Sequence, residues 1–278
     1  MHNQYKSEKN LRIFGISDLH LEFYPNDTAV EQVIKNIKQG SANLPEADVL
    51  VLAGDIGDPV EKSDVYFRLL QEFKRTYKNV VLVAGNHEHY RIKNYDRSST
   101  YDCLKKICND TGVIFLEKNS VIIQRVKFIG TTLWSMACAS TVFSLGDFGR
   151  VYNDVTQYNE EFKQCYEWLE KELSQQPMGP DQGALNYDVC VVVTHHLPSH
   201  QLCHERFKNC KALNTAFYTD ILDQLPMSRV KYWFCGHTHE SMVKKLKGQD
   251  GEVTVIVNPM GYPKEPRKTK MSLDVYMI

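Results

Sequence analysis

The sequence predicts an α/β fold in which two sheets pack face to face with helices outside them. Short apolar runs alternate with segments of helical periodicity, so the first half follows a β-α-β-α-β order, and the second half is richer in strands. The chain has 278 residues, of which 42% are hydrophobic and 24% are charged. This composition is that of an ordinary globular protein with a sizeable core.

In the first half we expect strands over residues 11–17, 48–53 and 80–84, and helices over 28–39 and 60–77. The apolar residues of the first helix recur at the spacing of one helix face, and Gly40 suits its end. The second and third strands are continuous apolar runs, which are typical of strands buried on both faces. Next come a helix over 100–109, a short strand over 113–116, and one or two strands over 121–129.

A helix is clearest over residues 157–175, where Phe162, Tyr166, Leu169 and Leu173 share one face. The strand pattern then restarts. We expect a strand over 189–194, a helix over 215–225, a strand over 230–235, a hairpin of 242–246 and 253–257 around the turn 248–251, and a last strand over 271–278.

The whole chain, residues 1–278, is predicted to form a single domain. The most linker-like stretch, 174–186, contains two prolines and two glycines, but candidate functional residues lie on both sides of it. We therefore interpret it as a surface loop.

Charge and composition exclude several classes of function. The formal net charge is −1, so no strong overall field attracts nucleic acid or an anionic membrane. The first ten residues are polar and lack the apolar core of a secretory signal, and no run approaches the ~18 apolar residues of a membrane span. The eight cysteines show no C-x-x-C pair, so we expect reduced thiols and a cytoplasmic protein.

Five polar clusters, each after a predicted strand, contain most of the candidate metal-binding and catalytic residues. They are Asp18-Leu19-His20, Gly54-Asp55, Gly85-Asn86-His87-Glu88, His195-His196 and Gly236-His237-Thr238-His239. Each has a structural alternative: a solvated Asp with a hydrogen-bonded His for the first, and a helix cap for Asp55. Together, two carboxylates, an amide and several imidazoles at strand ends make a ligand set for two divalent metals.

The ordered set D-x-H, G-D, G-N-H-E, H and G-H-x-H, spanning Asp18 to His239, resembles the calcineurin-like metallophosphoesterases. That resemblance implies a four-layer α/β/β/α sandwich of two mixed sheets with a binuclear metal centre. It also implies hydrolysis of phosphate esters by a hydroxide that bridges two metals, which could be Mn, Fe, Zn or Ni.

The resemblance also implies residue roles. Asp18, His20, Asp55 and His239 would hold one metal, and Asp55, Asn86, His195 and His237 the other. His87 would stabilise the transition state or protonate the leaving oxygen. Glu88 would orient His87, or alternatively serve as an acid in the first turn of a helix. His195 is chosen over His196 because the family ligand directly follows the strand; His196 would line the pocket or be a solvated neighbour.

Two differences from the protein Ser/Thr phosphatase branch narrow the class of substrate. The runs Gly54-Asp-Ile-Gly-Asp-Pro59 and Ala84-Gly-Asn-His-Glu88 lack the arginines of the protein Ser/Thr phosphatase branch. We therefore expect a small-molecule phosphomonoester or phosphodiester as substrate. Cyclic-nucleotide phosphodiesterase-like activity, nuclease activity and a non-catalytic protein-binding scaffold remain alternatives, and the oligomeric state is open.

Three segments could form the rim of the site. Arg150, between predicted elements, could grip a phosphate oxygen or be a plain surface residue. Residues 198–214 could be a mobile lid, which we favour over a zinc site because the Cys and His spacing fits no standard one. Tyr262 could stack on a base or an aromatic leaving group, or belong to a structural turn.

Overall fold

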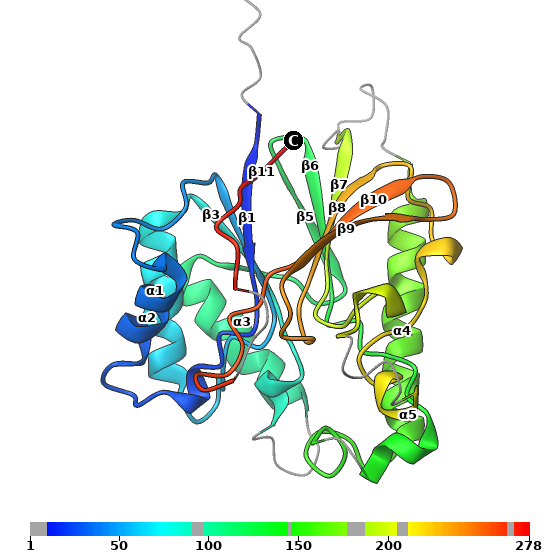
Figure 1. Ribbon diagram of the computed structural model, residues 1–278, viewed down its shortest axis with the longest axis horizontal. Helices are drawn as coiled ribbons and strands as arrows, with labels where there is room; N and C mark the ends of the chain where they lie inside the picture. The colour runs from blue at the N-terminus through cyan, green and yellow to red at the C-terminus, as the bar shows by residue number, and fades with distance from the viewer. Residues whose placement is uncertain (1–9, 91–96, 144–145, 177–186, 205–210, 266–269) are drawn as a thin grey trace, which may run out of the picture.

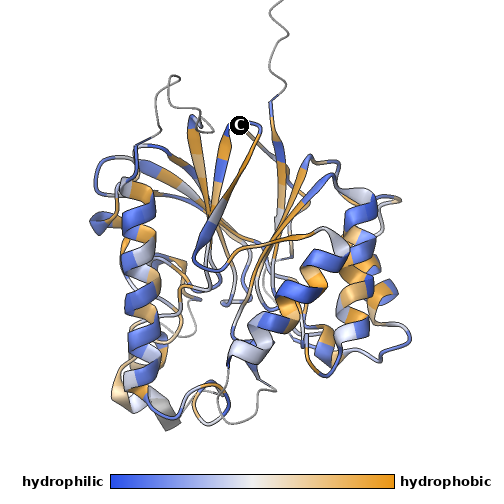
Figure 2. Cartoon of the chain, turned by 180° about the vertical axis from the view of Figure 1, so that it is seen from behind, coloured by the Kyte–Doolittle hydropathy of each residue, from blue (hydrophilic) through white to orange (hydrophobic). Residues whose placement is uncertain are grey.

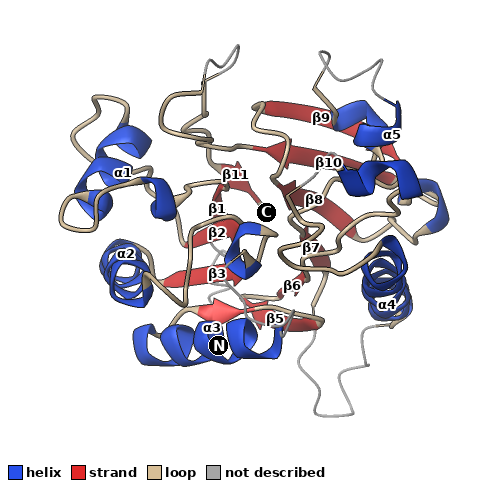
Figure 3. Ribbon diagram, turned by 90° about the horizontal axis from the view of Figure 1, so that it is seen from below, coloured by secondary structure: helices blue, strands red, loops and turns tan. Residues whose placement is uncertain are grey.

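The computed structural model describes residues 10–90, 97–143, 146–176, 187–204, 211–265 and 270–278. Two mixed sheets face each other, with helices on both outer sides (Figures 1 and 3). The predicted α/β architecture is confirmed. Among the described residues, no helix has both the length and the hydrophobicity that a membrane crossing requires.

The first sheet has the strand order β11-β1-β2-β3-β4. Its strands are β1 (Arg12–Ile16), β2 (Val49–Ala53), β3 (Asn79–Val83), β4 (Ile114–Phe115) and β11 (Tyr276–Met277). All neighbours are parallel except the pair of β1 and β11. The helices α1 (Ala29–Lys38), α2 (Ser63–Thr76) and α3 (Arg97–Thr111) cover its outer face (Figure 1).

The second sheet has the order β5-β6-β7-β8-β10-β9. Its strands are β5 (Asn119–Ile123), β6 (Val126–Gly130), β7 (Val189–Val193), β8 (Val230–Cys235), β9 (Met242–Lys247) and β10 (Glu252–Val257). The helix α4 (Val155–Ser174) and the short α5 (Lys211–Asn214) lie on its outer side (Figure 3).

Alternation along each strand divides the core into layers. In β2, Leu50 and Leu52 pack against the helices, whereas Val49 and Val51 pack between the sheets. Side chains of a strand alternate between its two faces, so a continuous apolar run is needed where both faces are covered. Figure 2 shows the strands as mostly hydrophobic and the helices as carrying both hydrophobic and hydrophilic residues.

The main correction concerns residues 215–225, which were predicted to be helical. They form turns and one short 3-10 helix, η7 (Leu222–Gln224). The backbone of Leu197 instead bonds with Phe217 and Thr219 across a β-bridge to Tyr218. Pairing between distant segments has thus overridden local helical spacing.

Other differences are smaller. Residues 121–129 divide into β5 and β6 in a hairpin, and the last strand is confined to β11. Parts of the predicted loop over 174–186 and of the predicted lid over 198–214 lie outside the described residues. The described parts of the second include η5 (His200–Leu202) and α5.

Candidate metal centre

The candidate site lies where strands of both sheets end. β1, β2 and β3 run parallel, as do β7 and β8, so the loops that follow these strands start at one edge of each sheet. These loops carry the seven predicted ligands Asp18, His20, Asp55, Asn86, His195, His237 and His239. The loops after β1 and β3 also contain two short 3-10 helices, η1 (Leu21–Phe23) and η2 (His87–His89).

One group consists of Asp18, His20, Asp55 and His239, each offering a ligand atom within 4.8 Å of the others. The Nε2 atoms of His20 and His239 face each other at 3.0 Å. The Nε2 of His239 lies 3.2 Å from Oδ1 of Asp18. Nitrogen and carboxylate atoms that converge in this way form a donor set typical of a divalent transition metal.

A second group consists of Asp55, His195 and His237, and therefore shares Asp55 with the first. The Nε2 of His195 lies 3.3 Å from Oδ2 of Asp55 and 3.0 Å from Oδ1 of Asn86. The Nε2 of His237 is buried and has no hydrogen-bond partner. Because buried polar atoms are nearly always paired, this unpartnered nitrogen fits a bound cation.

The backbone of these loops is unusual. Five of the predicted ligands have left-handed φ angles between 51° and 69°: Asp18, His20, Asp55, His237 and His239. Such angles cost free energy in residues other than glycine and concentrate at functional sites.

Two glycines permit close approach of the loops. A Cβ on Gly85 would lie 2.2 Å from Oδ1 of Asp55, and one on Gly236 would lie 2.6 Å from Oδ2 of Asp18. The glycines in the predicted motifs therefore leave the space that the two carboxylates occupy.

Hydrogen bonds at the far nitrogen orient three of the imidazoles. The Nδ1 atom of His195 lies 2.9 Å from the carbonyl oxygen of Ala53. The Nδ1 atom of His20 lies 3.0 Å from Oε1 of Glu22, and that of His239 lies 2.6 Å from Oε2 of Glu265. With Nδ1 donating to an oxygen, Nε2 is left to face the centre. This is the usual arrangement of metal-binding histidines.

The amide of Asn86 is oriented in the same way. Its Nδ2 donates to Oδ1 of Asp147 and to the hydroxyl of Tyr90, both at 2.9 Å. Tyr90 also donates to Asp147 at 2.8 Å. The Oδ1 of Asn86 is consequently directed toward His195 and the centre.

The electrostatics suit cation binding. Burial tends to raise the pKa of Asp18, but the hydrogen bond and charge of His239 outweigh it and lower that pKa. Burial lowers the pKa of His20 and of His237, which keeps both imidazoles neutral. For His195, burial tends to lower the pKa, but Asp55 outweighs it and raises the pKa to about 9, so cation binding there would release a proton.

His87 lies beside the first group, and its nearest carboxylate is Glu22. Oε1 of Glu22 lies 2.8 Å from Nδ1 of His87 and 3.0 Å from Nδ1 of His20. On its other side, Nε2 of His87 lies 3.1 Å from the hydroxyl of Tyr262. The ring of Tyr262 also packs against His20 and His239, with centroids 4.4 and 4.5 Å apart.

Glu88, which was expected beside the ring of His87, has other partners. Its buried carboxylate accepts hydrogen bonds from the backbone N–H groups of Asp55, Ile56, Gly57 and Gly85 at 2.6–3.3 Å. It therefore ties the loop after β2 to the loop after β3. These contacts differ from the expected one, in which Glu88 orients the ring of His87.

Two further predicted residues lie behind or outside this cluster. His196 is fully buried, with its ring 4.3 Å from that of His237 and its Nε2 3.2 Å from the hydroxyl of Tyr158. Arg150 is exposed, and its guanidinium lies over the ring of Tyr90 at 5.0 Å. His196 is thus no solvated neighbour, and Arg150 contacts Tyr90, whose hydroxyl accepts a hydrogen bond from Asn86.

Sequence reasoning missed three carboxylates that contact predicted site residues: Glu22, Asp147 and Glu265. Glu22 had a local signal, because it stands two residues after His20 in Asp18-Leu-His-Leu-Glu. The other two are separated from their partners by 61 and 26 residues and carry no local signal.

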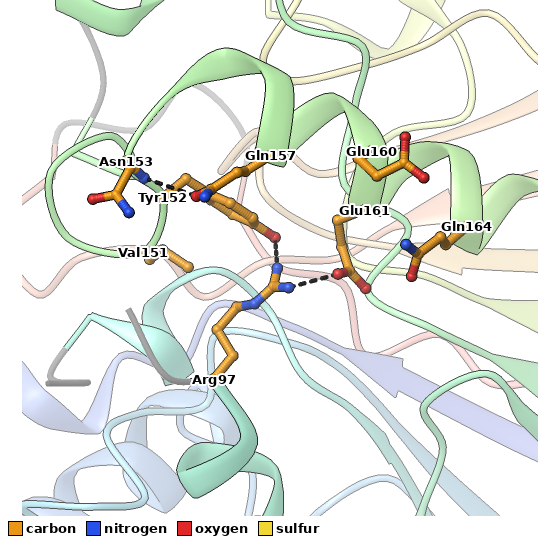
Figure 4. Close-up of a pocket in the computed structure, with 8 residues that line it drawn as sticks. All are labelled: Arg97, Val151, Tyr152, Asn153, Gln157, Glu160, Glu161 and Gln164. Atoms are coloured by element: carbon orange, nitrogen blue, oxygen red, sulfur yellow. Dashed lines mark hydrogen bonds and ion pairs between the residues drawn. The ribbon is translucent and has the colours of Figure 1, made fainter. Parts of the chain in front are cut away.

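A polar hollow of about 400 Å³ lies against α4, away from the candidate ligands (Figure 4). Arg97 crosses it and contacts the hydroxyl of Tyr152 and, at 2.6 Å, the carboxylate of Glu161. Glu161 is also paired with Lys118 at 2.8 Å. Because two cations already neutralise its buried acid, we place no ligand there.

Comparison with known proteins shows the family to which the chain belongs. The family model for calcineurin-like phosphoesterase matches residues 11–241. An uncharacterized protein, L509, of Acanthamoeba polyphaga mimivirus is 25% identical, over 90% of this chain and 91% of its own length. The crystal structure of phosphopantetheinyl hydrolase (PptH) from Mycobacterium tuberculosis is similar with a TM-score of 0.63 and 19% identity, covering 96% of this chain and 95% of that one. TT1561 of Thermus thermophilus has a TM-score of 0.49 and 12% identity over 90% of each chain.

PptH is similar enough to show the same fold. The family model covers most of the chain, including every predicted ligand. The protein therefore belongs to the calcineurin-like phosphoesterase family, a family of phosphoester hydrolases that use divalent metals.

Proposed function

We propose that this protein hydrolyses small-molecule phosphate esters at a centre of two divalent metal ions. The observation that supports this most strongly is that Asp55 belongs to two adjacent groups of candidate ligands. A carboxylate has two oxygens and can serve two cations. We assign Asp18, His20, Asp55 and His239 to one cation, and Asp55, Asn86, His195 and His237 to the other. The ions are chosen among Mn, Fe, Zn and Ni, all of which accept this mixture of nitrogen and oxygen ligands.

Bound cations would supply charge to neutralise the phosphoryl oxygens and would lower the pKa of a bound water toward neutrality. In the overall reaction, a water oxygen bonds to phosphorus and the bond from phosphorus to the leaving oxygen breaks. The electron pair of that bond goes to the leaving oxygen, which must then take up a proton.

His87 is our candidate for the residue that supplies this proton. Glu22 holds its Nδ1, so Nε2 faces outward toward the hydroxyl of Tyr262. Burial tends to lower the pKa of His87, but the charges of Asp55 and Glu22 outweigh it and raise the pKa, which favours the proton-donating form. Glu88 supports the site by holding the loop that carries His87.

Tyr262 is our candidate for contact with the substrate, because it borders His87. Arg150 and His196 have weaker positions, one exposed on Tyr90 and the other buried behind His237. The substrate is a phosphomonoester or a phosphodiester. The even charge balance argues against nucleic acid as the main partner, and the complete ligand set argues against a non-catalytic scaffold.

We also propose a single domain over residues 1–278 and a cytoplasmic location. The two sheets share one core layer, and the centre uses loops from both. The seven cysteines that the structure describes are all free thiols, as a reducing compartment would keep them.

The test combines metal analysis with two model esters. The protein, purified without chelator, should contain about two metal ions per chain. With added Mn²⁺ it should hydrolyse bis-p-nitrophenyl phosphate, p-nitrophenyl phosphate or both, and the ratio would separate diesterase from monoesterase. Two metals without turnover of either ester would contradict the proposed substrate range. No metal and no turnover would favour the scaffold.

Three variants separate metal binding from proton donation. Asp55→Ala and Asn86→Ala should lose metal and activity together. His87→Ala should keep its metal and lose about 10²- to 10⁴-fold in turnover, the usual contribution of a general acid. Full turnover of the His87 variant would contradict its role.

A further inference from the structure

A largely apolar hollow of about 550 Å³ lies beside the candidate metal centre. It is lined by Phe23, Tyr262, Pro263, Lys264 and Glu265. Phe23 stands three residues after His20, and Tyr262 lies in the loop after β10. The hollow therefore lies between the loop after β1, which carries Asp18 and His20, and the loop after β10.

Phe23 is exposed in an unusual way. The residue is 54% exposed, and it is the one aromatic residue among the exposed large hydrophobics of the described chain. Covering such a ring with another apolar group removes apolar surface from water and is favourable. The ring of Phe23 stands edge-on to that of Tyr262, with centroids 5.1 Å apart and planes at 81°. The two rings thus form two walls of one corner.

This corner adjoins the group that we assign to proton donation. The hydroxyl of Tyr262 lies 3.1 Å from Nε2 of His87, and the centroids of Phe23 and His87 are 6.2 Å apart. A general acid must lie within hydrogen-bond reach of the leaving oxygen. The hydroxyl of Tyr262 marks one place where an oxygen meets that nitrogen. A leaving oxygen that took the place of this hydroxyl as partner of Nε2 would bring the carbon atoms attached to it near the rings of Tyr262 and Phe23.

We propose that Phe23 and Tyr262 form the subsite for the leaving group, and that this group carries an uncharged planar ring. This inference rests on the proposed phosphoesterase function and specifies its substrate class. A ring in the corner would stack on or meet edge-on both aromatic side chains, the geometry that aromatic pairs prefer. Glu265, which also lines the hollow, is already engaged with Nδ1 of His239 and the backbone N–H of Tyr262, so no free carboxylate there calls for a cationic group.

The test uses two esters with similar reacting oxygens. 2-Phenylethyl phosphate and butyl phosphate both release a primary alcohol, and only the first has a ring. Each is assayed as the monoester and as its methyl diester, so that the result does not depend on whether the protein prefers monoesters or diesters. We expect the wild-type protein to favour the phenylethyl ester by about tenfold in kcat/KM, mainly through KM, a typical discrimination for an apolar pocket.

Phe23→Ala should bring the ratio of the two kcat/KM values close to one, whereas Phe23→Tyr, which keeps a ring, should preserve it. Val243→Ala is the matched control, because Val243 is 51% exposed on the edge strand β9, and the ratio should stay at the wild-type value. A wild-type ratio near one, or a ratio that Phe23→Ala leaves unchanged, would overturn the proposal.

A binding measurement separates this proposal from the proposed function. If the wild-type protein hydrolyses neither these esters nor the two p-nitrophenyl esters, the proposed function fails. The subsite is then judged by saturation-transfer NMR with 2-phenylethyl phosphonate on Zn²⁺-loaded protein. Saturation of the ring protons that is lost in Phe23→Ala and kept in Phe23→Tyr would support the subsite. Equal saturation in all variants, or none in the wild type, would reject it.

Discussion

Oε1 of Glu22 lies 2.8 Å from Nδ1 of His87 and so holds the imidazole that we assign to proton donation. The same oxygen lies 3.0 Å from Nδ1 of His20, a candidate metal ligand. One carboxylate thereby sets the orientation of two rings with different roles. Burial tends to raise the pKa of Glu22, but its hydrogen bonds with the two histidines outweigh this and lower the pKa to about 2. Glu22 is therefore ionised at neutral pH.

Removing this carboxylate should impair proton donation. We expect Glu22→Ala to lower turnover by about 10- to 100-fold, the usual cost of losing a group that orients a site histidine. The loss should be larger for an alkyl phosphate than for p-nitrophenyl phosphate, because nitrophenolate leaves with little need of a proton. Glu22→Gln keeps an accepting oxygen and should recover part of the loss.

Glu31→Ala removes an exposed acid from the first turn of α1 and is the control. Its turnover of both esters should match that of the wild type. Equal losses for both esters in Glu22→Ala would show that Glu22 does not act through His87.

Asp147 should affect metal binding without being a ligand. Its buried carboxylate accepts a 2.9 Å hydrogen bond from the amide of Asn86. Without it, that amide can rotate, so we expect Asp147→Ala to weaken metal affinity by about 10- to 100-fold. Competition with a fluorescent chelator would measure this.

Asp154→Ala is the matched control for Asp147→Ala. Asp154 is exposed, and its side chain caps α4 by accepting from the backbone N–H of Gln157 at 3.0 Å. Its loss should cost about 1 kcal/mol of stability and leave metal affinity unchanged. Wild-type affinity in Asp147→Ala would argue against the assignment of Asn86 as a ligand oriented by Asp147.

Gly15 in β1 is required for the contact between the two sheets. A Cβ at this position would lie 2.3 Å from Cδ1 of the buried Phe234 on β8. Overpacking of this kind typically costs about 1–3 kcal/mol, so Gly15→Ala should lower the free energy of unfolding by that amount in urea titrations. Gly40→Ala should lower the free energy of unfolding by about 1 kcal/mol. No atom lies within 4 Å of a Cβ added there, so only the left-handed φ of 89° is unfavourable. If Gly15→Ala were as stable as the wild type, the two sheets could move apart by the needed distance at no cost in free energy.

Cys138 should be the most reactive of the described thiols whose pKa is shifted. Its hydrogen bond with Ser140, at 3.0 Å, stabilises the thiolate and helps to lower the pKa of Cys138 to about 7. Burial raises the pKa of the thiols of Cys108, Cys165, Cys190, Cys203 and Cys235.

Because the thiolate is the nucleophile, alkylation of Cys138 by iodoacetamide should increase as the pH rises through about 7. Peptide mapping by mass spectrometry would follow each cysteine. Ser140→Ala should raise the pKa of Cys138 and slow its labelling at pH 7, while labelling at pH 9 should change little. A pH profile that Ser140→Ala does not shift would contradict the role of this hydrogen bond.

The sequence by itself determined the strands and the order of the polar clusters. Strand 49–53 and strand 79–83 were predictable because an apolar run between two covered faces is a local pattern. The clusters were predictable because the ends of parallel strands meet at one edge, and glycines such as Gly85 and Gly236 permit the turns there.

Only the tertiary structure decided which residues support that centre. Glu22 meets His87 across 65 residues, and Asp147 meets Asn86 across 61. The predicted helix over 215–225 gave way to backbone pairing with Leu197 for the same reason. The periodicity of a segment indicates which of its own faces are buried. The contacts above depend instead on how distant loops pack against one another, and no local pattern contains that information.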